Sequence, residues 1–278
     1  MTKPTETARV DASWSDPLTE RSTRVVSYAK LHRGAARRKA GLFLAEGYNS
    51  VDAALATGRA TVLLVTEDAA ERHREILRRA VDTGVDVQAI TARAADKLSE
   101  SVTPPGLFAV CGLLDASLDD VLAASPRLLA IAVAGSEPGN VGTLIRTSAA
   151  LGADAVVLAG ESVDPHNGKS VRASAGSIFH IPVVRAGDPL ELLKRLRTSG
   201  IATCATAGGG ELTLPEADAV LAGPVAWLFG NEAHGLPGDV LADADHRISI
   251  PIQDGAESLN LAAAASICLY VSSRAHAD

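Results

Sequence analysis

The stretch LLAIAVAGSEPGNVGTLIRTSAA, residues 128–150, decides how this 278-residue chain folds. It opens with an apolar run, 128–134, of the length of a buried strand. Glycine and proline then mark a turn, and Asn140, a residue type that often caps helices, precedes apolar residues at helical spacing. The stretch therefore predicts a strand, a turn and a helix, the repeating unit of a doubly wound parallel sheet.

The same alternation continues to the end of the chain. β-Rich apolar runs are separated by stretches of helical periodicity, which is typical of α/β proteins. We expect strands at 155–159, 181–184, 201–206, 225–229 and 247–252, and helices at 140–151, 169–177, 189–199, 237–242 and 258–273. Residues 128–278 thus form one predicted α/β domain whose ligand site lies at the carboxyl ends of its strands.

The residues before it predict a smaller α/β unit at 21–113, after a disordered tail at 1–20 and before a linker at 114–127. The linker is expected to hold one helical turn. Within the unit, the patterns predict helices at 22–40, 48–57, 69–81 and 94–100 and strands at 61–65, 85–90 and 107–113.

Composition excludes several classes of protein. Hydrophobic residues make up 47% of the chain and charged residues 21%, as in an ordinary globular protein. Nine aromatic residues are too few for an RNA-recognition-motif surface. The three cysteines, which lack a CxxC spacing, are expected to be buried, and the seven scattered histidines suggest no metal. No apolar run reaches a membrane-spanning length, and the first 17 residues lack the apolar core of a signal peptide, so we expect a cytoplasmic protein.

Charge is distributed unevenly. The net charge is −7, yet residues 21–39 hold seven Lys or Arg residues and His32, with no acid until Glu46. Such a cluster is a candidate site for a polyanion, with Arg33, Arg37 and Arg38 as contacts to nucleic acid. The alternative is a solvated helix face.

Three segments of the predicted sheet domain carry polar residues beside turns. In the first, Arg146 lies outside the apolar stripe of its helix, and its guanidinium could hold a phosphate. The alternative is an ordinary surface arginine. In the second, 229–237, Gly230 allows close approach of a ligand, and Glu232 could hold Arg146 or a backbone amide. In the third, Ser258 and Asn260 begin an apolar helix, where free N–H groups can hold a polar ligand.

The sequence does not match either of two familiar phosphate-binding patterns. The glycines at 135, 139 and 142 do not form GxGxxG, and Gly168-Lys169-Ser170 lacks the leading glycine of a P-loop, because Val163 stands there. A dinucleotide-dependent Rossmann enzyme or an NTPase is therefore disfavoured.

Together, and in this order, the three segments resemble the signature motifs of the SpoU (TrmH-like) family of SPOUT RNA 2′-O-methyltransferases. The resemblance spans 128–270 and rests on Asn140 with Arg146, on Gly230-Asn231-Glu232 and on Ser258-Leu259-Asn260; residues 171–177 also resemble the family's linking motif. Residues 21–113, with Ala45-Glu46-Gly47, are similar to the L30e-like RNA-binding domain of ribosomal RNA members, which include the thiostrepton-resistance group.

The resemblance implies an S-adenosylmethionine-dependent RNA 2′-O-ribose methyltransferase acting on 23S ribosomal RNA. It also implies a homodimer formed through the catalytic domain, a C-terminal trefoil knot, and no use of a metal. By motif position, the implied catalytic residues are Arg146, Glu232, Ser258 and Asn260, the cofactor contacts are Thr206, Gly230, Ile250 and Leu259, and Asn140 orients the RNA.

Two positions depart from the family pattern: Glu137 replaces the usual aspartate, and Ala233-His234 replaces residues of Glu-Gly type. His234 is not at a catalytic position of the family, and we do not expect it to act as a base. The family account makes Arg146 the proton acceptor, but the very high pKa of arginine favours a role for its charge instead.

Three alternatives stay open on the sequence. The chain could methylate transfer RNA, or it could be a catalytically silent RNA-binding protein of the same fold. A small-molecule enzyme on a doubly wound sheet is the third, and it would show no salt-dependent binding to RNA.

Overall fold

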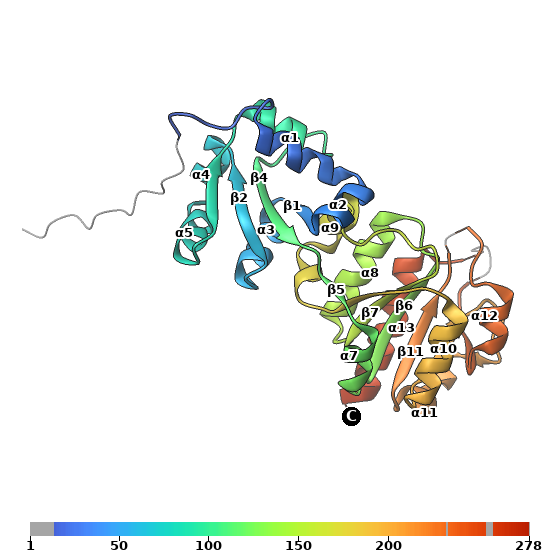
Figure 1. Cartoon of the computed structure of the whole chain (residues 1–278). Helices are drawn as coiled ribbons and strands as arrows, with labels where there is room; N and C mark the ends of the chain where they lie inside the picture. The colour runs from blue at the N-terminus through green and yellow to red at the C-terminus, as the bar shows by residue number, and fades with distance from the viewer. Residues whose placement is uncertain (1–13, 232, 254–257, 278) are drawn as a thin grey trace, which may run out of the picture. The chain divides into compact units, whose positions relative to one another are not determined.

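The computed structural model describes residues 14–231, 233–253 and 258–277. The chain divides into two compact units, Met1–Leu113 and Leu114–Asp278, which are described in turn (Figure 1). Among the helices of the described residues, none is long and apolar enough to cross a membrane.

The first unit is built on a mixed four-stranded sheet. β4 is antiparallel to both of its neighbours, whereas β2 and β3 run parallel. The strands lie in the order β1 (Leu42–Glu46), β4 (Leu107–Gly112), β2 (Ala60–Val65), β3 (Asp86–Ala89). The helices are α1 (Thr23–Ala29), α2 (Gly34–Ala40), α3 (Tyr48–Ala56), α4 (Glu67–Arg72), α5 (Arg74–Asp82) and α6 (Ala92–Leu98), with a 3-10 turn, η1 (Lys30–His32).

The structure of this unit differs from the sequence expectations in four places. The single helix expected at 22–40 is interrupted at Arg33, whose backbone is extended, and the helix expected at 69–81 is divided at His73. β1 was not predicted at all. Leu18, placed in the disordered tail, instead exchanges backbone hydrogen bonds with Ala89 and Thr91 beside β3; residues 1–13 lie outside the described residues.

The second unit contains an eight-stranded sheet in which every paired strand is parallel. The strands lie in the order β10 (Leu212–Thr213), β12 (His246–Ser249), β9 (Ala202–Thr206), β11 (Val225–Phe229), β6 (Leu128–Val133), β7 (Ala155–Ala159), β8 (Val183–Ala186), β5 (Asp115–Ala116). The doubly wound sheet is confirmed. The expected linker 114–127 in fact contributes β5 to this sheet, as well as helix α7 (Leu118–Ala123).

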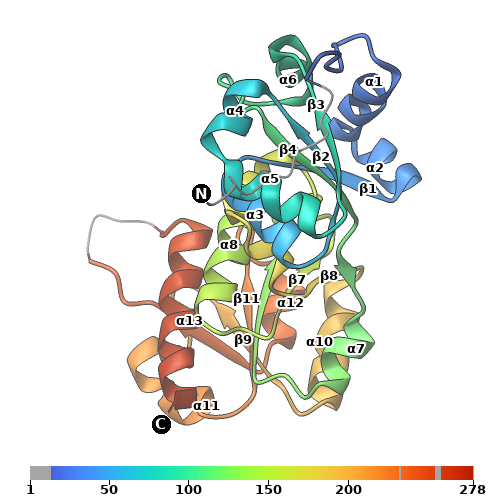
Figure 2. The ribbon, with the colours of Figure 1, turned by 90° about the vertical axis from the view of Figure 1, so that its left-hand side faces the viewer.

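Helices cover both faces of this sheet, as Figure 2 shows for α13 (Leu261–Ala277) and α8 (Pro138–Ala150) on one side and α10 (Pro189–Thr198) and α7 on the other. Alternate strand residues point to opposite faces. Leu129 and Ile131 of β6 pack towards Leu193 of α10 and Val240 of α12, while the Trp227 indole donates a hydrogen bond to Ser272 of α13 at 2.8 Å. The helices are α8 (Pro138–Ala150), α9 (Gly168–Ser174), α10 (Pro189–Thr198), α11 (Asp218–Leu221), α12 (Gly238–Asp243) and α13 (Leu261–Ala277), with 3-10 turns η2 (Ser177–Phe179) and η3 (Leu214–Glu216).

Two element ends differ from expectation at the predicted site. β12 ends at Ser249, so Ile250 lies beyond the strand rather than within it. α13 begins at Leu261, which leaves Ser258, Leu259 and Asn260 as a non-helical approach to the helix. Both differences place backbone groups in loops at the carboxyl edge of the sheet.

Candidate active site

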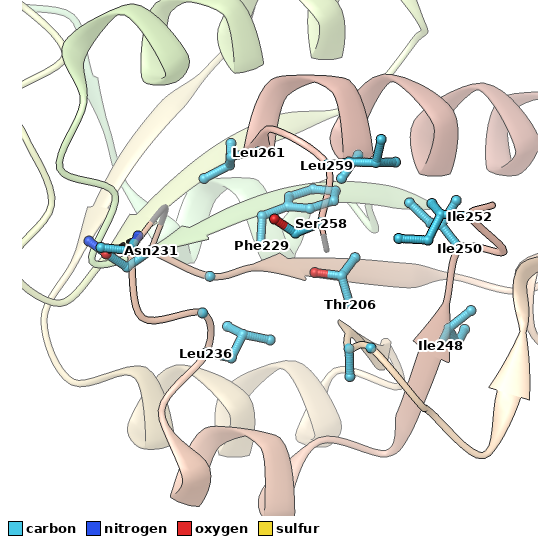
Figure 3. Close-up of a pocket in the computed structure, with 16 residues that line it drawn as sticks. Thr206, Phe229, Asn231, Leu236, Ile248, Ile250, Ile252, Ser258, Leu259 and Leu261 are labelled. Carbon is cyan, nitrogen blue, oxygen red and sulfur yellow. Dashed lines mark hydrogen bonds between the residues drawn. The ribbon is translucent and has the colours of Figure 1, made fainter. Parts of the chain in front are cut away.

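A cavity of about 380 Å³ lies at the carboxyl ends of β9, β11 and β12 (Figure 3). Its lining comes from described residues within 206–208, 229–231, 233–236, 248–252 and 258–264, at and after the ends of these strands. Figure 3 places Thr206 and Ser258 in the middle of the site, Asn231 at one end and Ile250 at the other. Parallel strands bring these loops together because their carboxyl ends share one edge of the sheet.

The segment after β11 is a tight turn. Asn231 and Gly235 exchange backbone hydrogen bonds of 2.9 and 2.8 Å. Gly230 lies so close to this turn that a Cβ on it would be 2.2 Å from the Gly235 carbonyl carbon, so no larger residue fits without displacing the loop. The close approach exposes backbone groups of the turn to the cavity.

The Asn231 side chain joins this turn to the segment after β6. Its Nδ2 donates to the Ala134 carbonyl at 2.8 Å and to Ser136 Oγ at 3.2 Å. Its Oδ1 accepts from the Ala233 amide at 2.9 Å. The loops that follow two adjacent strands are therefore held together by one amide side chain, a role that the sequence analysis did not assign to Asn231.

The walls of the cavity combine apolar side chains with polar groups. Phe229, Leu236, Ile248, Ile250 and Leu261 supply apolar surface. The hydroxyl of Thr206 donates to the Leu228 carbonyl at 2.9 Å, which fixes the end of β9 beside β11. Among the sequence-predicted cofactor contacts, Thr206, Gly230, Ile250 and Leu259 all line this one cavity.

Asn140 and Asn260 meet beside the cavity although they are 120 residues apart. Asn260 Nδ2 donates to Asn140 Oδ1 at 3.1 Å, and Asn260 Oδ1 accepts from the Ala262 amide at 2.8 Å. The same side chain thus caps α13 and contacts the first turn of α8. Ser258 lines the cavity two residues before it.

The turn that leads into α8 is fixed by the unusual Glu137. Its side chain accepts from the Gly139 amide at 3.2 Å, as a helix cap, and from Lys169 Nζ at 2.5 Å. Ser170 Oγ also donates to the Pro138 carbonyl at 3.0 Å. Glu137, and not Asn140 as predicted, therefore caps the helix, which begins at Pro138 and leaves Asn140 in its first turn. α9 supports the turn through Lys169 and Ser170.

Arg146 and Glu232 are not brought together by any described contact. Arg146 is exposed on α8 and does not line the cavity, and its guanidinium forms no hydrogen bond or ion pair with another described residue. Glu232 lies outside the described residues. The predicted pairing of these two residues stays a prediction.

The basic cluster of the first unit divides into two kinds of residue. Arg33 and Arg38 are exposed, but Arg37 is only 3% exposed, and its guanidinium donates to the carbonyls of Leu31 and His32 at 2.8 and 3.0 Å. These carbonyls lie where the expected long helix is interrupted, so they need side-chain donors. The prediction that Arg37 contacts phosphate is therefore wrong. Arg37 instead stabilises the turn between α1 and α2.

His234 and the three cysteines do not line the cavity. His234 is exposed. The three cysteines are free and buried, and burial raises the pKa of Cys111 and of Cys204 to about 12. Within the described part of the chain, no three His, Cys, Asp or Glu residues gather as metal ligands would.

Known proteins share both units. Residues 127–270 match the SpoU rRNA Methylase family, and residues 22–109 match the MRM3-like substrate binding domain. The 23S rRNA (guanosine(2553)-2'-O)-methyltransferase RlmP of Bacillus subtilis is 32% identical, with 90% of this chain and 96% of that protein covered. The 23S rRNA (uridine(2479)-2'-O)-methyltransferase of Streptomyces viridochromogenes is also 32% identical, over 91% and 90%.

Solved structures of rRNA and SpoU methyltransferases are also similar to this chain. The SpoU methyltransferase AviRb from Streptomyces viridochromogenes, in complex with the cofactor AdoMet, has a TM-score of 0.79 and 30% identity, covering 91% of this chain and 98% of that one. The AdoMet-bound rRNA methyltransferase from Sinorhizobium meliloti has a TM-score of 0.78 and 27% identity, covering 95% and 96%.

The fold and the comparisons define an α/β methyltransferase, and its described residues form a cavity at the carboxyl edge of a parallel sheet. The chain belongs to the SpoU rRNA methylase family, and its cofactor is S-adenosylmethionine. The family resemblance expected from the three motifs is confirmed, together with the substrate-binding domain before them.

Proposed function

We propose that this protein transfers a methyl group from S-adenosylmethionine to the ribose 2′-hydroxyl of a nucleotide in 23S ribosomal RNA. The single observation that carries the proposal is the cavity behind the Gly230 turn, with Asn140 and Asn260 in contact beside it. The names of the two similar enzymes from Bacillus subtilis and Streptomyces viridochromogenes support the substrate class.

The cavity fits the cofactor in size and in chemistry. Its volume of about 380 Å³ falls within the range of small-molecule sites. Apolar side chains such as Ile250 and Leu259, together with backbone groups near Gly230, would hold the cofactor. When bound, S-adenosylmethionine supplies an electrophilic methyl group on a sulfonium.

The residues of this chain would position the ribose and stabilise charge. Ser258 and Asn260 lie where their polar side chains can orient a hydroxyl towards the cavity. Arg146 would bind a phosphate of the RNA and stabilise the negative charge that develops as the hydroxyl loses its proton, and Glu232 would fix the geometry of Arg146. Orientation of the two reactants supplies a large part of the rate increase.

RNA capture is assigned to the first unit, with Arg33 and Arg38 as exposed phosphate contacts. Asn140 would orient the target nucleotide at the site. The proposed setting is the cytoplasm, where ribosomal RNA is available.

We also propose a homodimer formed through the second unit, and a trefoil knot in its carboxyl-terminal part, as the family resemblance implies. α13 supports the dimer, because Ile267 and Tyr270 on it are 38% and 55% exposed although both are large and apolar. Exposed apolar residues on one helix favour burial against a second copy of the chain.

The test is a map of ribose 2′-O-methylation in cells that lack this chain. Loss of one modified nucleotide in 23S RNA, restored by the native gene and not by an Arg146→Gln variant, is the expected result. Loss of a methylated nucleotide in transfer RNA would favour the alternative substrate. No change in any RNA, with no uptake of S-adenosylmethionine in calorimetry, would favour a silent binding protein.

A further inference from the structure

One wall of the cavity leads into a run of three glycines. Gly208, Gly209 and Gly210 follow β9, and Ala207 and Gly208 line the cavity. Glycine loses more conformational freedom on folding than any other residue. Contacts from outside the segment must therefore hold this wall in one shape.

Those contacts come from the start of β12. The Ala207 amide donates to the Ile248 carbonyl at 3.2 Å. Gly210 lies against Arg247, where a Cβ would be only 2.3 Å from the carbonyl oxygen of that residue. The glycine segment therefore packs closely against the backbone of β12. The side chain of the next residue, Glu211, adds further hydrogen bonds to β12.

Glu211 and Arg247 form a paired contact through three hydrogen bonds. The Arg247 amide and Nη2 donate to Glu211 Oε1 at 2.9 and 3.0 Å, and Nε donates to Oε2 at 2.8 Å. Two parallel bonds from a guanidinium to a carboxylate fix orientation as well as distance. The amide of Arg247, with further hydrogen bonds and the guanidinium charge, lowers the pKa of Glu211 to about 2, so the pair stays ionised at neutral pH.

The same guanidinium also holds the other side of the site. Arg247 Nη1 donates to the carbonyls of Leu241 and Ala244, at 3.2 and 3.0 Å, at the end of α12. α12 directly follows the segment after β11 that forms the opposite wall. One side chain therefore joins the segments after β9 and β11 to β12.

We propose that Arg247 and Glu211 are positioning residues for S-adenosylmethionine, which set the separation of the cavity walls without lining the cavity. The proposal rests on the proposed function. It assigns no chemical step to either residue, and their contribution is the pre-organisation of the glycine segment before the cofactor arrives.

The experiment compares Glu211→Gln and Arg247→Lys with the native protein by calorimetry with S-adenosylmethionine, and by methylation kinetics. Gln removes the charge, and Lys replaces the fork with a point charge. We expect each Kd for S-adenosylmethionine to rise about tenfold, because the wall must be ordered on binding. The KM for the cofactor should rise in parallel, with kcat at saturation within about twofold of the native value.

Arg197→Lys is the matched control. Arg197 also binds the end of α12, through the Asp243 carbonyl at 2.7 Å, and the Asp245 carboxylate at 3.3 Å, but neither bond reaches Glu211 or the glycine segment after β9. Its affinity for S-adenosylmethionine should match that of the native protein. The double variant of Glu211 and Arg247 should bind no more weakly than the weaker single variant, because both remove one contact.

A Glu211→Gln protein that melts cooperatively and binds S-adenosylmethionine with native affinity would overturn the proposal. Glu211 is 42% exposed, so this variant folds even where Arg247→Lys does not. An equal loss of affinity for S-adenosylmethionine in Arg197→Lys would also contradict the proposal, because it would show a general loss of stability. Failure of the native protein itself to bind S-adenosylmethionine would instead refute the proposed function on which the inference rests.

Discussion

Asn260 donates its side-chain amide to Asn140 at 3.1 Å, and so joins the start of α13 to the first turn of α8. Asn260 caps α13 with its other side-chain atom. The contact brings the first and third sequence motifs to one point beside the cavity, whose lining also includes the second motif. Asn260 therefore has two roles that can be tested independently. One side-chain atom stabilises helix α13, and the other sets the geometry of the site through Asn140.

Replacing Asn260 with serine should separate these roles. Serine is also a good helix cap, so the free energy of unfolding should fall by less than about 1 kcal/mol. The shorter side chain cannot reach Asn140, and we expect kcat to fall at least about tenfold through loss of orientation. Asn260→Ala removes both roles and should reduce stability as well. Native kcat in the serine variant, measured with saturating RNA, would show that the Asn140 contact is not used in catalysis.

Arg146→Gln should reduce turnover while leaving the fold and the cofactor site intact. Arg146 is exposed and does not line the cavity, so the melting temperature and the Kd for S-adenosylmethionine should not change. Loss of a charge that stabilises the transition state typically lowers kcat about 10²-fold to 10³-fold. Single-turnover methylation measures this step directly. An unchanged rate would remove Arg146 from the mechanism.

Gly230→Ala should abolish uptake of the cofactor. The added methyl group would be 2.2 Å from the Gly235 carbonyl carbon and 2.3 Å from the Leu236 nitrogen, so the turn must move. Gly238→Ala is the control, because a Cβ there meets nothing within 4 Å. Calorimetry with S-adenosylmethionine should show no heat for the first variant and native binding for the second. Native binding by both would place the cofactor elsewhere.

The basic cluster should divide into RNA contacts and a structural arginine. Arg33→Gln combined with Arg38→Gln should weaken RNA binding and lower the slope of log K against log salt by about 0.7 to 0.9 for each lost phosphate contact. Arg37→Gln leaves buried carbonyls without a donor and should instead lower the melting temperature. Filter binding across a salt series measures the first effect, and thermal unfolding the second. An unaltered slope in the double variant would contradict the proposed docking surface.

The Glu211–Arg247 pair should make stability depend on pH in the acid range. Hydrogen bonds from Arg247 lower the folded-state pKa of Glu211 to about 2, below its ordinary value of about 4.3 in an unfolded chain. A lowered pKa means that the stabilisation is complete above about pH 5 and disappears as the pH falls towards 2. Urea unfolding of the native protein and of Glu211→Gln should therefore differ at pH 7 and converge at low pH. A constant difference down to pH 2 would contradict the assigned pKa.

Periodicity predicted the second sheet well because its strands are buried on both faces. Runs such as β6 and β11 are apolar throughout, and helices of clear period separate them. β1 escaped prediction because a short apolar run is ambiguous on periodicity alone, and its pairing with β4 joins residues far apart in the chain. The interruption of the helix at Arg33 was not predicted either. It depends on the buried guanidinium of Arg37, which the sequence pattern cannot distinguish from a solvated one.

The candidate site was predicted by motif resemblance more than by spacing. Thr206, Gly230, Ile250 and Leu259 do line one cavity, although no local pattern joins these four positions. The contact of Glu211 with Arg247 had no signal at all, because it spans 36 residues and belongs to no motif. Tertiary hydrogen bonds between ordinary charged residues are visible only in the folded chain.

The most direct test of the central claim uses the purified protein, S-adenosylmethionine with a labelled methyl group, and 23S RNA from cells that lack this chain. We expect label at one nucleotide, in an alkali-resistant dinucleotide, because a methylated 2′-oxygen cannot attack the neighbouring phosphodiester. The Gly230→Ala protein should transfer none. Label on a base, or no transfer to RNA by a native protein that binds the cofactor, would contradict the account.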